Sequence, residues 1–397
     1  MSLPMPLQRT LCLALTLHVA TLAHAAESSA AAPKDLDKVE VRGRAQTLYR
    51  VDDAAVGTRT DTPLELVPQS IQVIPRELID DQAARQVTDL YRSISGISYF
   101  SYAGVTLRGF RQENVLYDGL RGDPYAGFSV PQLFNIERVE VLKGPAGALY
   151  GGGDAGGVIN YVTRKPQAAA ERRIEVQLGD KDFRAGSIEG TGPLNAAGSV
   201  RYRAGLYADN EKGVRWNTNS ESVIGDASLA FDVGQTGELV LQFTDITQNL
   251  GGNRLRGVPV NDAGTFLTNR RWNHNEASDF LDMRAKVALA QYRFAPLDTL
   301  DVDFAARWFS NTEHQMYHEP MGLIDRDRDG VAEWMTRQLR NQIRDNEAFT
   351  ANGNAVWRVT TGAVAHKVLF GADVYQLDAD FTAQTANSAD LARGAGP

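Results

Sequence analysis

The sequence predicts an α+β domain followed by the N-terminal part of an antiparallel transmembrane β-barrel. Two observations predict this architecture. Residues 49–170 mix short helix and strand patterns that glycines separate. From residue 171 to residue 397, segments of about ten residues alternate apolar and polar side chains, as the strands of a membrane barrel do. Residues 1–25 and 26–48 differ from both domains in composition, so the chain divides into four parts.

Residues 1–25 predict a secretory signal peptide. The basic residue Arg9 precedes an apolar run from Leu11 to Ala23, and small residues up to Ala25 form a cleavage site. The run is shorter than the roughly 20 residues that a membrane-spanning helix requires. The alternative is a buried N-terminal helix. Cleavage after Ala25 would remove Cys12, the single cysteine, and would leave neither disulfides nor thiolate metal sites.

The composition argues against several classes of protein. The chain has 49 acidic and 41 basic residues and a net charge of −8, whereas a nucleic-acid partner favours a basic surface. No segment approaches a run of about 18 apolar residues, so we expect no transmembrane helix. Neither a Ser/His/Asp arrangement nor a carboxylate pair stands out, and we therefore predict neither enzyme activity nor a cofactor.

Residues 26–48 predict a flexible leader that contains one strand pattern. Small and polar residues open the leader, and from Asp37 to Gly43 polar residues alternate with Val39 and Val41. An exposed segment of this kind can add as a strand to the sheet edge of a partner protein. The pattern fits equally well the first strand of the domain that follows.

The stretch 49–170 has the patterns of a small α+β domain. A short helix is predicted from Pro75 to Ile79, because proline is tolerated at the start of a helix, where its missing N–H costs nothing. A second helix is predicted from Val87 to Ser93. β-Rich runs predict strands at 105–107, 115–117 and 139–142, with glycines in the turns between them.

Residues 171–397 predict about nine strands of a barrel. In the first of them, Ile174, Val176 and Leu178 point to one face, whereas Glu175 and Gln177 point to the other. The same alternation recurs along the chain. The predicted strands are 172–179, 183–191, 200–208, 222–232, 238–247, 280–293, 299–309, 347–359 and 366–380.

Two features favour a membrane barrel over a soluble sandwich. Charged residues such as Arg203, Asp303 and Arg307 occupy a face that would be a dry core in a sandwich but a polar lumen in a barrel. Short turns also alternate with long polar loops at 249–278 and 311–345, as in outer-membrane barrels. The outer face of such a barrel contacts the lipid of the outer membrane.

Two shorter motifs fit structural roles. Residues 151–156 match the nucleotide-binding pattern G-x-G-x-x-G, but a β-rich run follows them, so close backbone packing explains these glycines better. His314 and His318 lie four residues apart, a spacing that could hold zinc on a helix. Because they follow a strand, we interpret them as residues of an outer loop.

Asp325, Asp327 and Asp329 resemble the start of a calcium-binding EF-hand loop. Gly330 follows them at the position where such loops need glycine. The twelfth position, where these loops carry a bidentate Glu, is Thr336. The alternative is a charged, solvated outer loop, and calcium binding here is a weak prediction.

Several long motifs resemble those of TonB-dependent siderophore receptors, especially the ferrichrome and pyoverdine types. The resemblance covers residues 37–397 and implies that residues 49–170 form a plug inside a barrel of 22 strands. About nine strands would then be a part of that barrel, and we expect the chain to end within it and not to transport by itself. The motifs are Val67–Ile79 (VPQSIQVIPRELI), Leu107–Phe110 (LRGF), Tyr117–Arg121 (YDGLR), Ile136–Gly151 (IERVEVLKGPAGALYG), Gly156–Asn160 (GGVIN) and Lys165–Pro166.

The resemblance implies a receptor of the bacterial cell outer membrane that takes up ferric siderophores. Asp37, Lys38, Val39, Glu40 and Val41 then look like the TonB box, which adds a strand to the energy-transducing protein TonB. The leader holds no extra signalling domain, so we expect a transporter. Alternatives are a related receptor for cobalamin, haem or an oligosaccharide, and a passive porin or adhesin, which needs neither box nor plug.

The resemblance also implies ligand-binding residues. Arg108 of the R-G-F motif corresponds to a plug residue that contacts the siderophore in ferrichrome-type relatives. Plug loops that hold Tyr102, Arg121, Tyr125 and Phe128 are expected to face outward, where an arginine and aromatic rings suit an anionic chelate. The alternative is that the aromatic residues pack against the barrel.

Two carboxylates are implied to hold the plug in place. Glu137 and Glu140 resemble family residues that pair with barrel arginines. No contact between the protein and Fe³⁺ is expected, because the chelator already fills the coordination shell of the ion.

Overall fold

The computed structural model describes residues 49–392, apart from 61, 102–103, 126, 146, 151–153, 253, 262, 331 and 333. The residues from 45 onward form one compact unit. The predicted signal peptide and the predicted TonB box at 37–43 lie outside the described residues, as does Tyr102. In the part of the chain that is described, no helix has the length and apolar character needed to cross a membrane.

The first domain combines two small sheets with short helices. Its elements are α2 (Ala55–Thr58), η1 (Leu64–Leu66), β1 (Ser70–Pro75), α3 (Arg76–Asp81), α4 (Val87–Leu90), η2 (Tyr91–Ser93), β2 (Ile97–Tyr99), β3 (Val105–Leu107), β4 (Phe110–Arg111), β5 (Val115–Tyr117), β6 (Leu120–Arg121), β7 (Ile136–Lys143), α5 (Gly147–Tyr150) and β8 (Gly157–Thr163). Among the described residues, one sheet has five strands in the order β1-β7-β8-β5-β6, and the other has three in the order β2-β3-β4. The predicted helices and strands of this stretch are confirmed, and the second helix divides into α4 and η2.

Close backbone packing explains the two glycines where β8 begins. A Cβ atom at Gly156 would lie 2.0 Å from the carbonyl oxygen of Leu107, and one at Gly157 would lie 2.0 Å from that of Leu142. No side chain fits at such distances, so both positions require glycine. The structure therefore confirms the packing interpretation for Gly156.

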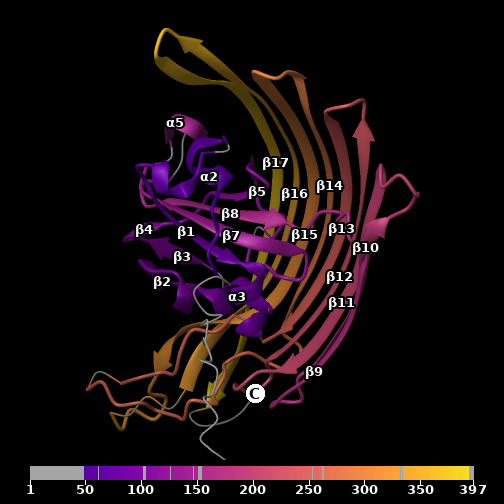
Figure 1. Ribbon diagram of the computed structural model, residues 1–397. Coiled ribbons are helices and arrows are strands. Elements are labelled where there is room, and N and C mark those ends of the chain that lie inside the picture. Colours follow the sequence, from indigo (N-terminus) through magenta and orange to yellow (C-terminus); the bar gives the residue numbers. More distant parts are fainter. Residues whose placement is uncertain are drawn as a thin grey trace, which may run out of the picture. The chain divides into compact units, whose positions relative to one another are not determined.

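The second domain is a single antiparallel sheet that curves around one side of the first (Figure 1). Over the described residues it has nine strands in unbroken sequence order, as predicted. The strands are β9 (Glu171–Leu178), β10 (Arg184–Pro193), β11 (Val200–Lys212), β12 (Asn219–Val233), β13 (Gly237–Gly251), β14 (Phe280–Leu297), β15 (Leu300–Ile324), β16 (Trp334–Thr361) and β17 (Val364–Ala392).

The prediction of a long loop at 311–345 is wrong. β15 and β16 run through most of this stretch and leave a connection only at 325–333. Here polar residues occupy both faces: Asn311 and Glu313 are buried against the first domain, and Thr312 lies on the opposite, exposed face. Apolar–polar alternation is therefore absent, and the sequence pattern gave no sign of a strand. The connection between β13 and β14 is long, as predicted, and spans 252–279.

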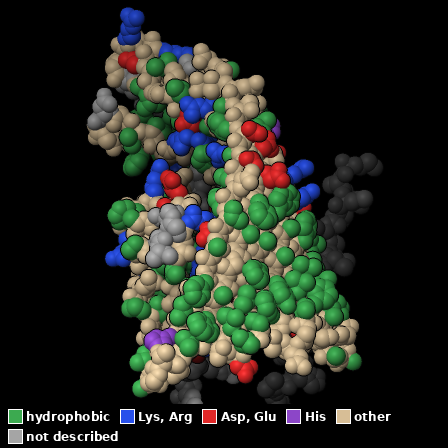
Figure 2. All heavy atoms as spheres, turned by 90° about the horizontal axis from the view of Figure 1, so that it is seen from above, with side chains coloured by type: hydrophobic (Ala, Val, Ile, Leu, Met, Phe, Trp, Pro, Cys, Tyr) green, Lys and Arg blue, Asp and Glu red, His purple; other side chains and the backbone are tan. Residues whose placement is uncertain are grey.

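The face of the sheet that points away from the first domain carries an apolar band. On β15 this face presents Leu300, Val302, Phe304, Ala306 and Trp308 in alternate positions. This stretch matches the roughly nine to eleven residues that a tilted strand needs to cross a bilayer. Hydrophobic side chains gather into a continuous area on one side of the molecule (Figure 2).

Candidate functional site

One segment of the first domain, 121–130, lies along the inner face of the sheet. Polar side chains of β13 and β15 form hydrogen bonds with its backbone. Along the segment, these bonds move successively closer to the end of the sheet where the long connections lie. These hydrogen bonds therefore fix the position of the segment along the sheet, which we call the wall. The contacts are Arg307 Nη2 to the carbonyls of Arg121 (2.8 Å) and Gly122 (2.5 Å), Asn311 Nδ2 to the carbonyl of Pro124 (2.8 Å), the Phe128 N–H to Glu313 Oε2 (2.6 Å), and the Val130 N–H to Gln248 Oε1 (2.8 Å).

Phe128 is the centre of a cluster at this end of the sheet, which we call the Phe128 cluster (Phe128, Arg254, Glu313, Tyr317 and Arg344). The Arg254 guanidinium lies 3.7 Å from the centroid of the Phe128 ring and 4.5 Å from that of Tyr317. Arg344 lies 5.9 Å from the Phe128 centroid and 3.9 Å from the Glu313 carboxylate. Both arginines are within cation–π range of the ring.

The Phe128 cluster joins three parts of the molecule. Phe128 belongs to the first domain, Tyr317 to β15, and Arg254 to the long connection between β13 and β14. Two guanidinium groups beside aromatic rings suit a ligand that is both anionic and aromatic. Sequence reasoning missed Arg254, Tyr317 and Arg344, because two of the three lie in the stretch mistaken for a loop and none belongs to a motif.

The structure gathers only part of the predicted ligand set. Phe128 is in the cluster. The backbone carbonyl of Arg121 accepts a hydrogen bond from Arg307 of the wall, in the same segment of the first domain. Tyr125 is only 5% exposed and lies in a hydrophobic cluster that the first domain shares with the sheet, which matches the alternative that this ring packs against the barrel. Burial raises the pKa of Tyr125.

Arg108 is not brought to the Phe128 cluster. It is exposed, with a φ of 54°, in the turn between β3 and β4. A Cβ atom built at Gly144 would lie 3.4 Å from its Nη1 atom, so Arg108 neighbours the end of β7 that points away from the sheet (Figure 1). The described contacts of Arg108 therefore assign it no part in the cluster.

The anchoring carboxylates behave differently from the expectation. Glu140 pairs with Arg138 of the same strand at 2.8 Å and accepts the N–H of Val56, so it is bound inside the first domain. Its side chain is fully buried, facing α2 instead of the wall. Glu137 pairs with Arg164 at 3.5 Å, again within the first domain. The predicted pairing of both residues with barrel arginines is corrected.

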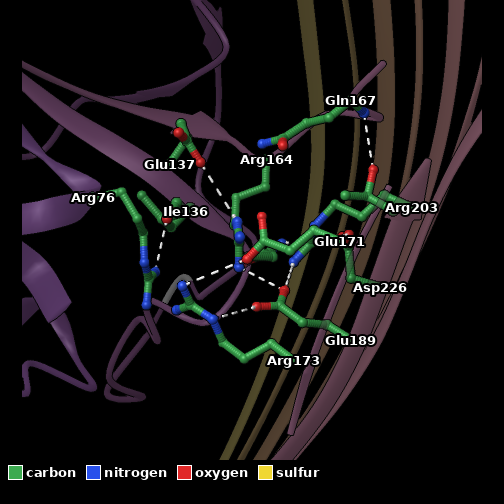
Figure 3. A network of polar contacts seen from close by, with 12 residues as sticks. Arg76, Ile136, Glu137, Arg164, Gln167, Glu171, Arg173, Glu189, Arg203 and Asp226 are labelled. Atoms are coloured by element: carbon green, nitrogen blue, oxygen red, sulfur yellow. Dashed lines mark hydrogen bonds and ion pairs between the residues drawn. The ribbon is translucent and has the colours of Figure 1, made fainter. Parts of the chain in front are cut away.

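The first domain is instead held to the wall by Arg164. Here the first domain supplies the arginine and the wall supplies the carboxylate, the reverse of the expected arrangement. Its Nη1 lies 2.5 Å from Glu189 of β10, and Glu189 also binds Arg203 of β11 at 2.9 Å (Figure 3). Arg203 continues to Asp226 of β12 at 2.5 Å. The Arg203 side chain is 3% exposed and that of Asp226 is 0% exposed. Breaking such a buried pair costs about 3–5 kcal/mol, because a buried charge is left uncompensated.

A second contact fixes α3 to the wall. Asp80 of α3 pairs with Arg173 of β9 at 3.2 Å and with Arg76 at 2.6 Å. Burial opposes ionisation, but the hydrogen bonds and charges of Arg76 and Arg173 lower the pKa of Asp80 below its usual value. Asp80 and Arg173 are 32% and 39% exposed. A pair this accessible to water is worth only about 0–1 kcal/mol.

The three aspartates of the calcium motif come together in the connection 325–333. Carboxylate oxygens of Asp325, Asp327 and Asp329 lie within 4.8 Å of one another. Asp325 already accepts the N–H groups of Arg328 (2.6 Å) and Gly330 (2.8 Å), and these bonds lower its pKa, the one from Gly330 most. The turn therefore has a structural reason for its acidic residues, and calcium binding stays a prediction.

The loop interpretation of the two histidines is wrong, since both lie on β15. His314 Nε2 contacts Asn341 at 2.8 Å, and His318 Nδ1 contacts Asp279 at 2.8 Å. Four residues along a strand span about 13 Å, too far for both rings to bind one zinc ion.

Known proteins share this combination of an inserted domain and a strand wall. Residues 63–158 match the family model of the TonB-dependent receptor plug domain. The ferripyoverdine receptor of Pseudomonas aeruginosa is 27% identical over 318 residues, which are 75% of this chain and 38% of the relative. The catecholate siderophore receptor Fiu of Escherichia coli K12 is 25% identical over 390 residues, which are 91% and 50%. The metal-pseudopaline receptor CntO of P. aeruginosa is 29% identical over 249 residues, which are 60% and 35%.

Solved structures agree on the fold. The pyoverdine receptor FpvA of P. aeruginosa PAO1 matches with a TM-score of 0.78 at 20% identity, over 84% of this chain and 50% of that one. The open form of Fiu matches with a TM-score of 0.77 at 21% identity, over 84% and 52%.

The first domain is therefore a plug domain, and the sheet has the fold of the barrel wall in outer-membrane receptors. Residues 63–158 are those of a TonB-dependent receptor plug domain, and the chain is similar to siderophore receptors of the bacterial outer membrane. It spans about a third to a half of the length of the curated relatives it matches.

Proposed function

We propose that a complete barrel that contains this chain captures a ferric siderophore at the Phe128 cluster and imports it across the outer membrane with energy from TonB. The observation that carries the proposal is the meeting of plug, wall and long connection at Phe128. A ligand bound there would touch a plug residue and a loop residue at once, so its arrival could be sensed by the plug.

The side chains of the cluster favour an anionic chelate with aromatic groups. Arg344 and Phe128, which are partly exposed, offer a positive charge and a ring face, and the buried Arg254 and Tyr317 support them from behind. Glu313 is already engaged by the Phe128 N–H at 2.6 Å, so the cluster is a recognition surface for the organic ligand and not a donor set for iron. The iron is cargo, enclosed by its chelator.

Energy coupling follows from the affinity that scarce iron demands. Binding in the nanomolar range corresponds to about −12 kcal/mol, and a ligand held that tightly leaves slowly. Work must therefore be done on the plug to release it. The segment Asp37–Gly43 is the proposed point of attachment for TonB, on the basis of its sequence pattern alone.

Uptake by iron-starved cells tests the proposal. Cells that express the chain within a completed 22-stranded barrel receive a panel of radiolabelled ferric chelates, and surface binding in the cold is separated from accumulation on warming. The expected result is binding and accumulation of one class of anionic aromatic chelate. Binding of cobalamin, haem or an oligosaccharide instead would show that the proposed ligand class is wrong. Passage of many unrelated small solutes without saturation would show that the protein is a passive pore and not a receptor.

A further inference from the structure

A groove of about 700 Å³ runs across the outward face of the wall, the face that points away from the plug. Its floor is one row of cross-strand neighbours on β9 to β13, and the exposed apolar side chains of Ile188 and Leu206 stand in the row beside it. Arg173 and Glu189, which adjoin the floor row along the chain, face the plug, so the floor row faces the membrane. The floor row consists of Arg172, Gly190, Ala204, Ala227 and Phe243.

The groove begins at one edge of the wall and leads into the apolar band. Arg172 is the second residue of β9, whereas Phe243 is the seventh residue of β13, counted from the same end of the sheet. That end carries the short turns, which face the periplasm in outer-membrane barrels. The floor row is therefore inclined, with Arg172 nearest the periplasmic edge and Phe243 deepest in the band.

Two hydrogen-bond donors flank the groove where it begins. A Cβ atom built at Gly190 would lie 3.4 Å from the Tyr202 hydroxyl oxygen and 3.9 Å from Cγ of Arg172, so both side chains border the same open space. Within the described residues, neither the Arg172 guanidinium nor the Tyr202 hydroxyl has a hydrogen-bond or ion-pair partner. A phosphate group accepts hydrogen bonds from both kinds of donor, and a guanidinium also supplies the opposite charge.

The charges of the groove favour an anion at this end alone. At the other end the groove is lined by Asp245, whose cross-strand neighbour is Lys286, so the two opposite charges offset each other. Arg172 therefore provides the unbalanced positive charge, at the edge of the membrane where the head groups of anionic lipids lie. The apolar stretch between the two ends suits a hydrocarbon chain.

We propose that the groove binds one glycerophospholipid of the periplasmic leaflet, with its phosphate between Arg172 and Tyr202 and one acyl chain along the floor row. The row crosses four strand spacings, about 19 Å, and one leaflet has a hydrocarbon depth of about 15 Å, so an inclined chain fits along it. A chain that lies in the groove gains dispersion contacts that a chain passing over it lacks. This site does not depend on the proposed import function.

The first test measures lipid affinity by native mass spectrometry of the chain within a completed 22-stranded barrel. The protein in detergent is titrated with dioleoylphosphatidylglycerol and with dioleoylglycerol, which has the same chains and no phosphate. Arg172→Gln should lower the affinity for the phospholipid about fivefold, the effect of one arginine at a membrane surface. Arg184→Gln, at the exposed first residue of β10, should leave it unchanged. Equal affinities of the two variants, or equal binding of the two lipids, would overturn the head-group site.

The second test locates the acyl chain in the membrane. The same barrel is placed in vesicles that contain a phosphatidylglycerol with a photoreactive diazirine in one acyl chain, and the labelled peptides are identified after illumination. The label should concentrate on β11 and β12. Ala204→Phe, which fills the floor row, should remove this label, whereas Ala306→Phe, on the same apolar face outside the groove, should retain it. Label spread evenly over the apolar face of the unchanged protein would show ordinary lipid contact and would contradict the proposal.

Discussion

The guanidinium of Arg254 rests on the ring of Phe128, 3.7 Å from its centroid, and so connects a long barrel connection to the plug. Arg254 is 6% exposed, which removes much of the water that would weaken the interaction. If the proposed ligand binds at the Phe128 cluster, Arg254 links that site to the plug through this contact.

Replacing Arg254 tests the ligand site. Arg254→Gln should weaken surface binding of the chelate by about 2- to 30-fold, the range of a partly desolvated cation–π contact. The control is Arg270→Gln, an exposed arginine of the same connection. Titration of radiolabelled chelate onto cells in the cold gives both affinities. Unchanged affinity of the Arg254 variant would place the ligand elsewhere.

The coupling between the two residues can be measured separately. Phe128→Leu keeps an apolar side chain but removes the ring, so it should cost affinity, and little more should be lost when Arg254→Gln is added. A double-mutant cycle on the binding constants measures this interaction. Additive losses would show that the two side chains act on the ligand independently.

The buried network should dominate the stability of the plug–wall contact. Asp226→Asn removes one of the two carboxylates that pair with the buried Arg203, the other being Glu189, and should lower the free energy of unfolding by about 1–3 kcal/mol. Asp232→Asn, which weakens a pair on Arg201 with a 48% exposed carboxylate, should cost at most about 1 kcal/mol. Denaturant titration in detergent compares them. Similar small losses would show that the network is hydrated and weak.

His274 should make the long connection sensitive to acid. Burial lowers its pKa from 6.5 to about 4, so the folded loop holds a neutral ring while the opened loop takes up a proton. Stability of the loop is therefore complete above about pH 6.5 and is lost as the pH falls toward 4, by at most about 3 kcal/mol.

Hydrogen exchange of residues 252–279 at several pH values checks this dependence. His274→Asn should flatten it, and His366→Asn, at an exposed position, should not. Protection that is independent of pH in the unchanged protein would contradict the assignment.

Gly156 tests the close packing of the plug. Gly156→Ala places a methyl group 2.0 Å from the Leu107 carbonyl oxygen and should destabilise the plug by about 1–3 kcal/mol or more. Gly225→Ala has open space around the new atom and should be neutral. Resistance of the plug to protease in outer-membrane preparations separates the two. Equal resistance would mean that the loop before β8 moves to make room.

Much of the fold was predictable because each domain has its own periodicity. Alternation from Ile174 to Leu178 locates β9, and Pro75 marks the start of α3. The parts of β15 and β16 next to the connection 325–333 were not predictable. Polar side chains such as Thr312 and Glu313 line both faces there, beyond the apolar band. Without an apolar face, a strand has no signature in the sequence.

The site was less predictable than the fold, since it depends on which residues the register brings together. Phe128 could be proposed from its motif, but its partner Arg254 lies more than a hundred residues away in a connection without a pattern. Arg164 was missed for a similar reason. The resemblance pointed to plug carboxylates and barrel arginines, whereas the wall supplies Glu189 and the plug supplies the arginine.

Energised import is the central claim, and accumulation of the identified chelate by cells that carry a proline in the proposed TonB box tests it most directly. Val39→Pro removes a backbone donor from the strand that would pair with TonB, and Ala32→Pro, earlier in the leader, is the control. The account predicts that Val39→Pro binds the chelate normally in the cold but does not accumulate it, and that Ala32→Pro accumulates it fully. Full accumulation by Val39→Pro would contradict energised import and leave a passive pore.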